Sequence, residues 1–310
     1  MGITRNFERG QAELEVTKVF QESTLTSAYA TSPMKLLTPR SRGLSVWSYT
    51  SSFGGGLVAG DQTHFEVRIR RAARCFVGTQ SATKIYRNPA RQPCGHVTRA
   101  VLEEDSFLAF MPSPVQPFAD SCYAQKQTFY LAPGAGLVLL DSFTAGRMAC
   151  GERWAFAQFS SRNEVFAGLA VSPPASDGTG GVGGNGDGSA TPGSLPAEHP
   201  PARRVFLDSV CLEGRDNSLN SPHGTGRMNC FAMLLLLGAS LRERAGELLA
   251  IAGRKPVTPR ASLLVSASPV AEGAVLRLAG ERADQVEAEL HRYLGFLSGW
   301  LGDLPWLRQW

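Results

Sequence analysis

Residues 54–70 read GGGLVAGDQTHFEVRIR, a glycine-rich turn followed by a segment of strict alternation. From Gln62 to Arg70, polar residues alternate with a second set made up of Thr63, Phe65, Val67 and Ile69. A period of two places one set of side chains on the buried face of a strand and the other set in water. The stretch therefore predicts a half-buried β-strand that is entered through a sharp backbone turn.

Short β-prone runs recur through the first two thirds of the chain, at a spacing of roughly ten residues. Gly, Pro and Asn separate these runs, which are Glu13–Phe20, Leu44–Thr50, Cys75–Gly78, Ser106–Met111, Gln127–Leu131, Leu137–Phe143, Trp154–Phe159 and, further on, Arg204–Leu212. This rhythm favours sheets stacked in layers over alternating strand–helix units. We expect a mainly β fold.

Helical periodicity appears only late in the chain. Met228–Ala252 is apolar at first and then amphipathic, and Glu281–Leu301 carries apolar residues at three- and four-residue steps. Both segments are predicted to be helices. Between them, Ala261–Ser266 and Ala274–Leu278 read as a pair of strands. The C-terminal third is thus expected to be an α/β portion.

The segment Ser172–Pro201 is dominated by Gly, Ser, Pro and Asp and is predicted to be a flexible loop. It separates a β-rich body at 1–171 from a portion at 202–310 that holds the remaining strands and the helices. We expect the two to form one continuous domain. Residues 181–186 match G-x-G-x-x-G by letters, but they neither follow a predicted strand nor open a predicted helix, so they do not indicate a nucleotide site.

Composition narrows the function classes. The chain has 310 residues, 43% of them hydrophobic, which is enough for a sizeable core, and its net charge is only +4. Alternation places Arg68 and Arg70 on one solvated face, so the basic residues do not indicate a nucleic-acid surface. The chain has no run of 18 apolar residues that would predict a membrane span, and no apolar leader. Six cysteines without any C-x-x-C pair favour a reduced, cytoplasmic protein.

Common catalytic and metal-binding motifs are missing from the sequence. There is no Walker A loop, no G-x-S-x-G elbow, no H-E-x-x-H and no paired Cys/His spacing for zinc. His64 and His96 stand alone on predicted strands, and we interpret both as solvated residues rather than metal ligands.

Two acidic residues stand at the ends of predicted strands or turns. Asp61 closes the glycine-rich turn, and Asp141 ends the apolar run of residues 137–140. A carboxylate after four buried residues is costly unless it reaches water, a hydrogen bond or a cation. The residues alone leave two alternatives open: a turn-capping Asp61 with a hydrogen-bonded Asp141, or a carboxylate pair of the kind that glycosidases use.

Three segments together resemble the urease accessory protein UreD family, also called UreH. They are residues 55–61 (GGLVAGD), residues 79–87 (TQSATKIYR) and residues 139–154 (LLDSFTAGRMACGERW). The signature positions in them are Gly55, Gly56, Gly60, Lys84, Tyr86, Arg87, Gly146, Arg147, Gly151 and Glu152. The chain departs from the family pattern at Met148, where proline is common, and in the segment 172–201, which looks like an insertion.

The resemblance implies a helical stack of β-strands, resembling a β-helix of layered sheets, with a few α-helices mostly in the C-terminal third. It implies a protein that is not an enzyme and holds no stable cofactor. Such a scaffold binds the urease apoprotein and the accessory proteins UreF and UreG, and it passes nickel in transit to the urease active site. The positions matching the polar residues of that nickel path are Asp61, Thr83, Asp141 and Asp208.

Two other functions stay open at this stage. One is a β-rich glycoside-active enzyme that uses Asp61 and Asp141. The other is a passive interaction module without any role for metal. Trp306 and Trp310 could mark a partner surface, because tryptophan is enriched at interfaces, or they could pack the C-terminal tail on the body; we favour packing.

Overall fold

The computed structural model describes residues 9–40, 44–168, 203–214, 218–255, 258 and 260–308. The predicted loop Ser172–Pro201, the G-x-G-x-x-G match at 181–186 and Trp310 all lie outside these ranges. The division of the chain at 171 and 202 therefore stays a prediction.

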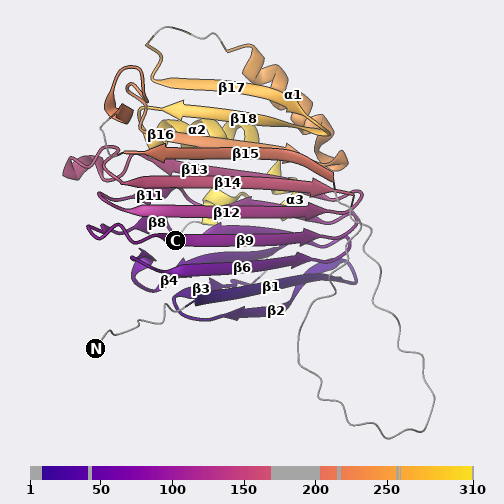
Figure 1. The fold of residues 1–310 in the computed structure, drawn as a ribbon. Coiled ribbons are helices and arrows are strands. Elements are labelled where there is room, and N and C mark those ends of the chain that lie inside the picture. The colour runs from indigo at the N-terminus through magenta and orange to yellow at the C-terminus, as the bar shows by residue number, and fades with distance from the viewer. Residues whose placement is uncertain are drawn as a thin grey trace, which may run out of the picture.

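Two sheets face each other across the interior (Figure 1). The first, sheet A, has the order β15 (Arg203–Glu213), β14 (Gln158–Ala167), β12 (Cys122–Leu131), β9 (Cys94–Leu102), β6 (Gln62–Ile69), β1 (Arg9–Val19) and β2 (Glu22–Ala30). The second, sheet B, runs β17 (Leu263–Val270), β18 (Gly273–Gly280), β16 (Cys230–Leu237), β13 (Gly136–Thr144), β10 (Phe107–Met111), β7 (Arg74–Thr79), β4 (Val46–Ser52) and β3 (Met34–Leu37). Short strands β5 (Gly56–Leu57), β8 (Thr83–Ile85) and β11 (Val115–Pro117) extend sheet B beside this path.

The chain adds strands to the two sheets in turn, which produces a coil. In sheet A, β1, β6, β9, β12 and β14 pair in parallel. In sheet B, β4, β7, β10 and β13 also pair in parallel. Antiparallel strands close the coil at both ends, with β2 and β3 at one end and β15 to β18 at the other. The predicted fold class, a helical stack of β-strands with few helices, is confirmed.

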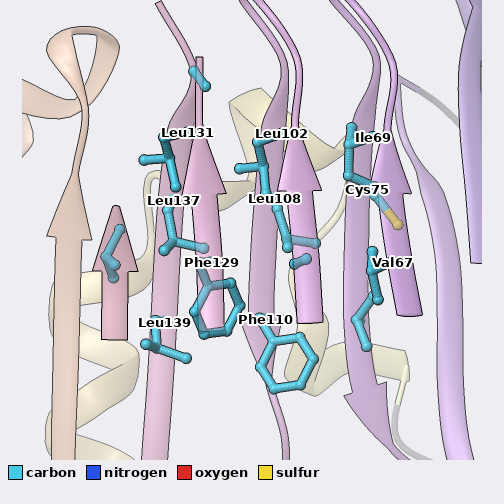
Figure 2. Close-up of a cluster of buried hydrophobic side chains, with 14 of the residues drawn as sticks. Val67, Ile69, Cys75, Leu102, Leu108, Phe110, Phe129, Leu131, Leu137 and Leu139 are labelled. Atoms are coloured by element: carbon cyan, nitrogen blue, oxygen red, sulfur yellow. The ribbon is translucent and has the colours of Figure 1, made fainter. Parts of the chain in front are cut away.

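Parallel pairing aligns apolar side chains into rows inside the coil (Figure 2). Ile69, Leu102 and Leu131 share one register across sheet A. Cys75, Leu108 and Leu137 face them in the matching row of sheet B. These side chains are at most 3% exposed, so each turn of the coil buries its apolar face against the turn before and after it.

The outer face of sheet B is covered by the helices α1 (Arg242–Gly253), α2 (Ala283–Leu294) and α3 (Leu297–Leu301). Val286, Leu290 and Leu294 of α2 recur at helical spacing and are buried against the sheet. The predicted helix Glu281–Leu301 is therefore confirmed in outline. Shorter 3₁₀ turns lie at Phe53–Gly55, Met148–Cys150, Ser218–Asn220, Ala239–Leu241 and Pro305–Arg308. In the described part of the chain, none of the helices has the length and apolar character needed to cross a membrane.

The sequence prediction was wrong in two places. The first half of the predicted helix Met228–Ala252 is the strand β16, and only Arg242–Gly253 is α-helical. Sheet B is covered on both faces, so β16 is an unbroken apolar run, and periodicity cannot distinguish such a run from a buried helix. Of the predicted strand Trp154–Phe159, only the last two residues belong to a strand, since β14 begins at Gln158. Trp154 has a φ of 53°, which a strand does not accommodate.

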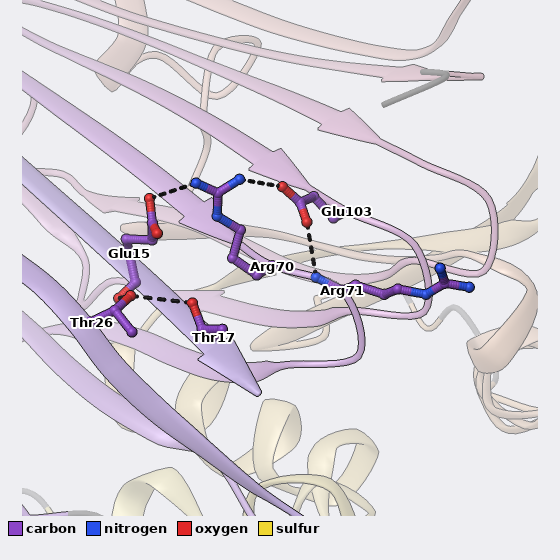
Figure 3. Close-up of polar contacts among 6 residues, drawn as sticks. All are labelled: Glu15, Thr17, Thr26, Arg70, Arg71 and Glu103. Carbon is purple, nitrogen blue, oxygen red and sulfur yellow. Dashed lines mark hydrogen bonds and ion pairs between the residues drawn. The ribbon is translucent and has the colours of Figure 1, made fainter. Parts of the chain in front are cut away.

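Arg70 ties three turns of sheet A together at one edge (Figure 3). Its guanidinium donates to Glu15 at 3.1 Å and to Glu103 at 2.8 Å, and Glu103 also accepts from the backbone N–H of Arg71 at 3.1 Å. The acids come from β1 and from the turn after β9, on either side of β6. Arg70 is thus a structural cross-link on a partly solvated face.

Leu108→Ala in the buried row of Figure 2 is expected to lower the free energy of unfolding by about 2–5 kcal/mol, through lost burial and the cavity left behind. Urea denaturation measures it. Leu264→Ala on β17 is the matched control, since Leu264 is 39% exposed and its truncation should cost far less. An equal loss at both positions would contradict the placement of the core.

Candidate functional site

A belt of polar side chains crosses the otherwise apolar interior of the coil. In sheet A, Thr63, His96, Gln125 and Ser161 share one register on four neighbouring strands. The adjacent row places Thr98, Gln127 and Asn163 at one register. We call these residues, together with Asp141 of sheet B, the polar belt. It separates the apolar cluster around Leu102 and Phe129 from a second cluster around Tyr123 and Phe159.

Asp141 joins the two sheets at the centre of the belt. It follows Leu137 and Leu139 on the inward face of β13 and is only 7% exposed. Its Oδ1 accepts from Gln125 Nε2 at 2.8 Å. Its Oδ2 accepts from Ser161 Oγ at 2.5 Å and from Asn163 Nδ2 at 2.7 Å. Asp141 lies within β13 rather than at a strand end, and it is a hydrogen-bonded interior carboxylate, which was one of the two alternatives left open by the sequence.

The protonation of Asp141 reflects two opposing effects. Burial raises the pKa of the carboxyl above its ordinary value, because the charged form loses contact with water. The hydrogen bonds from Ser161, Asn163 and Gln125 oppose this rise, while the negative charge of Asp208 adds to it. Burial therefore favours the neutral form of Asp141, and the three hydrogen-bond donors favour the ionised form.

Two cavities meet at Asp141. A cavity of about 90 Å³ is lined by Asp141 together with hydroxyl-bearing side chains, among them Thr63, Thr83 and Ser113. A second pocket of about 430 Å³ is lined by Asp141, Asp208, Arg277 and mostly apolar residues. Asp141 is thus a lining residue of both spaces.

Three of the four predicted path residues line these cavities. Thr83, at the start of β8, lines the smaller cavity together with Asp141. Asp208, on β15, lines the larger pocket, where its Oδ1 accepts from Arg277 Nη2 at 2.6 Å. This ion pair places a positive charge beside Asp208 in the lining of the pocket.

Asp61 does not belong to this group. Its Oδ2 accepts from the backbone N–H of Val58 at 2.9 Å, and its own N–H donates to the carbonyl of Val58 at 3.1 Å. It therefore caps the glycine-rich turn, and it is not among the residues that line either cavity at Asp141. A carboxylate pair of Asp61 and Asp141 thus has no geometric support, and neither does the glycosidase hypothesis built on it.

The prediction that His96 is a solvated residue was wrong. It points into the coil, lines the smaller cavity, and has both ring nitrogens within hydrogen-bonding distance of hydroxyls, Thr63 Oγ1 at 2.7 Å and Thr98 Oγ1 at 2.9 Å. Burial lowers the pKa of His96 to about 4, and the neighbouring His64 adds to this. The available signal was alternation: on β9, His96 and Thr98 share the inward face with Ala100 and Leu102.

The signature positions lie at one edge of sheet B rather than in the belt. Gly55 and Gly60 have φ angles of 72° and 85°, which favour glycine. At Gly56, a Cβ would meet the carbonyl oxygen of Lys84 at 2.2 Å, so only glycine lets β5 pair with β8. Tyr86 fixes the same turn by donating from its hydroxyl to the carbonyl of Gly54 at 2.5 Å.

The third signature segment continues this edge. Arg147 forms an ion pair with Glu152, and its guanidinium lies 4.2 Å from the ring centre of Phe118. Phe118 in turn contacts Tyr86 edge-on, at 5.5 Å between ring centres. Among the remaining positions, Gly146 has a φ of 103°, Gly151 has a φ of 72°, Lys84 is exposed, and Arg87 lies 3.6 Å from Asp120. The signature residues therefore stack the loops of successive turns.

A family model described as the UreD urease accessory protein matches residues 8–310. The chain belongs to the UreD family. The predicted resemblance, made from three short segments, thus extends over nearly the whole chain.

Curated UreD relatives support the assignment. A protein named urease accessory protein UreD from Sorangium cellulosum is 37% identical over 306 residues, which cover 97% of this chain and 84% of the relative. One of the same name from Anaeromyxobacter is 32% identical, covering 96% and 89%. Urease accessory protein D of Arabidopsis thaliana is 28% identical, covering 94% and 97%. Similarity to UreD proteins therefore reaches from bacteria to plants.

Asp141→Asn in this UreD chain is expected to lower the free energy of unfolding by about 1–3 kcal/mol, because an amide group cannot accept from all three donors that now meet the carboxylate. Chemical denaturation measures the loss. Asp61→Asn is the control: the amide oxygen of asparagine can still accept from the N–H of Val58, so we expect a change within about 0.5 kcal/mol. Equal stability of the Asp141→Asn variant and the unsubstituted chain would show that the belt does not depend on the carboxylate.

Proposed function

We propose that this chain acts in urease maturation as a scaffold that conducts nickel to the urease active site. It binds the urease apoprotein and the accessory proteins UreF and UreG in the cytoplasm. It is not an enzyme and holds no stable cofactor; nickel is cargo in transit. Membership of a family named for urease accessory proteins supports the maturation role.

One observation carries the nickel step of the proposal: Asp141 stands between two cavities within a belt of polar side chains. Ni²⁺ accepts oxygen and nitrogen ligands, which carboxylates, hydroxyls, amides and imidazole supply. Conduction requires contacts that are favourable enough for the ion to enter and weak enough for it to leave. In the described residues, His, Cys, Asp and Glu form no group of three or more that could hold a metal ion; the belt instead offers its donors one after another along neighbouring strands.

The candidate path residues have different places in this proposal. Thr83 lies on the smaller cavity, Asp141 at the junction and Asp208 at the larger pocket beside Arg277. Asp61 supports the path indirectly, because its turn holds Gly55, which lines the smaller cavity. We therefore expect substitutions of Asp141 to affect conduction itself, and those of Asp61 to affect the shape of the smaller cavity.

Asp141→Ala is expected to leave co-purification with UreF, UreG and the urease apoprotein intact, but to lower the nickel content of urease at limiting nickel. Nickel is measured by mass spectrometry of the purified urease, alongside its activity. Thr83→Val, which keeps the shape of the side chain, is expected to lower nickel transfer to a smaller degree.

Thr24→Val on the exposed face of β2 is the matched control for Thr83→Val and should transfer nickel like the unsubstituted chain. Normal nickel content in a strain without this chain would overturn the whole proposal. Unchanged transfer by Asp141→Ala, with normal transfer by the unsubstituted chain, would remove Asp141 from the path while leaving the scaffold role.

A further inference from the structure

His96 is the one imidazole that faces the polar belt in the described part of the chain. It stands on β9 between Thr63 of β6 and Gln125 of β12, at the same register. It lines the cavity that Asp141 and Thr83 also line. The other donors of the belt are hydroxyl, amide and carboxylate groups, so His96 adds a nitrogen donor to a row of oxygen ligands.

Two threonines hold the imidazole from opposite sides. Thr98 is completely buried and is not among the residues lining the cavity, so it supports the ring from behind at Nε2. Thr63 lines the cavity and meets Nδ1. A partner that accepts the proton of one ring nitrogen fixes the lone pair on the other, as is usual for metal-binding histidines. Thr98 accepting from Nε2–H leaves the lone pair at Nδ1, on the side of Thr63.

The hydroxyl of Thr63 has a second acceptor within reach. It lies 2.7 Å from His96 Nδ1 and 3.2 Å from the carbonyl oxygen of Gly95. For a metal ion to reach Nδ1, the Thr63 side chain must swing away from the ring, because turning its O–H alone leaves Oγ1 beside the lone pair; the hydroxyl can then donate to the carbonyl of Gly95 and stay paired. The ring is also neutral near pH 7, because burial lowers the pKa of His96 to about 4. No proton then competes with a metal ion for the ring.

We propose that His96 is the specificity-determining residue of the belt, a transient nitrogen ligand that favours nickel over magnesium. This inference rests on the proposed conduction of nickel. Mg²⁺ prefers oxygen ligands in octahedral geometry and gives up its water reluctantly, whereas imidazole suits Ni²⁺. Thr63 returns to the ring as the ion leaves, so the contact stays exchangeable. A passage of oxygen donors alone would discriminate poorly between the two ions.

The test uses the full chain in a complete activation mixture of urease apoprotein, UreF and UreG, with limiting NiCl₂ and increasing MgCl₂. The readout is the nickel content of urease. His96→Gln keeps a polar side chain but removes the imidazole, and we expect nickel loading at high magnesium to fall by about tenfold, the lower end of what disturbing a metal's ligand environment costs. His64→Gln is the matched control, because His64 lies on the outward face of β6.

A second variant separates specificity from folding. Thr98→Val keeps the shape of the side chain and leaves His96 in place, but it removes the acceptor that fixes the imidazole. We expect it to shift nickel loading at high magnesium in the same direction as His96→Gln, with a smaller effect. It therefore decides the question if His96→Gln fails to fold.

The outcomes are distinguishable. If the unsubstituted chain loads no more nickel than a mixture without it, the proposed conduction fails, and this inference fails with it. If the unsubstituted chain loads nickel, and His96→Gln and Thr98→Val match it at every magnesium concentration, only the role of His96 is overturned. A fall that is equal for His96→Gln and His64→Gln would also overturn it.

Discussion

Parallel pairing at a constant register is the constraint on which this structure depends. Each turn of the coil places its inward side chains directly beside those of the turn before, so residues of like character form rows across the sheets. Rows of leucine, isoleucine and phenylalanine make the apolar clusters. The same pairing lines up threonine, histidine, glutamine, serine and asparagine into one polar belt. A shift of register by one residue on any strand would break both kinds of row.

The belt is a costly feature for a protein interior, since buried polar groups must find partners or forfeit free energy. Here they satisfy one another: Tyr123 donates to Gln125, Gln125 donates to Asp141 and Ser161, and Gln127 donates to Asn163. Asp141 is the only carboxylate among them and draws donors from two strands of the opposite sheet. The network is thus satisfied within itself, although Asp141 also lines two cavities.

The residues that are easiest to recognise and the residues that face the cavities are largely different sets. The glycines, Tyr86, Arg147 and Glu152 hold the loops at one edge of sheet B, where backbone geometry and close contacts tolerate few side chains. Such positions leave compact sequence signatures. Residues of the belt, such as Gln125, Ser161 and Asn163, are separated by whole turns of the coil. They share no local motif, and only their inward register connects them.

The sequence by itself determined the β-rich class, the strand at Gln62–Arg70, the helix at Glu281–Leu301 and the family, because alternation, helical spacing and turn glycines are local properties of the chain. It also indicated that Asp141, after a run of buried residues, needs water, a hydrogen bond or a cation, without deciding which. It could not decide between strand and helix for Cys230–Leu237, whose two faces are both covered in the folded protein. The tertiary structure alone decided that Asp61 caps a turn, that His96 faces the interior and that Asp141 joins two cavities. These facts depend on which strands become neighbours, and a register between distant turns is not written in any single segment.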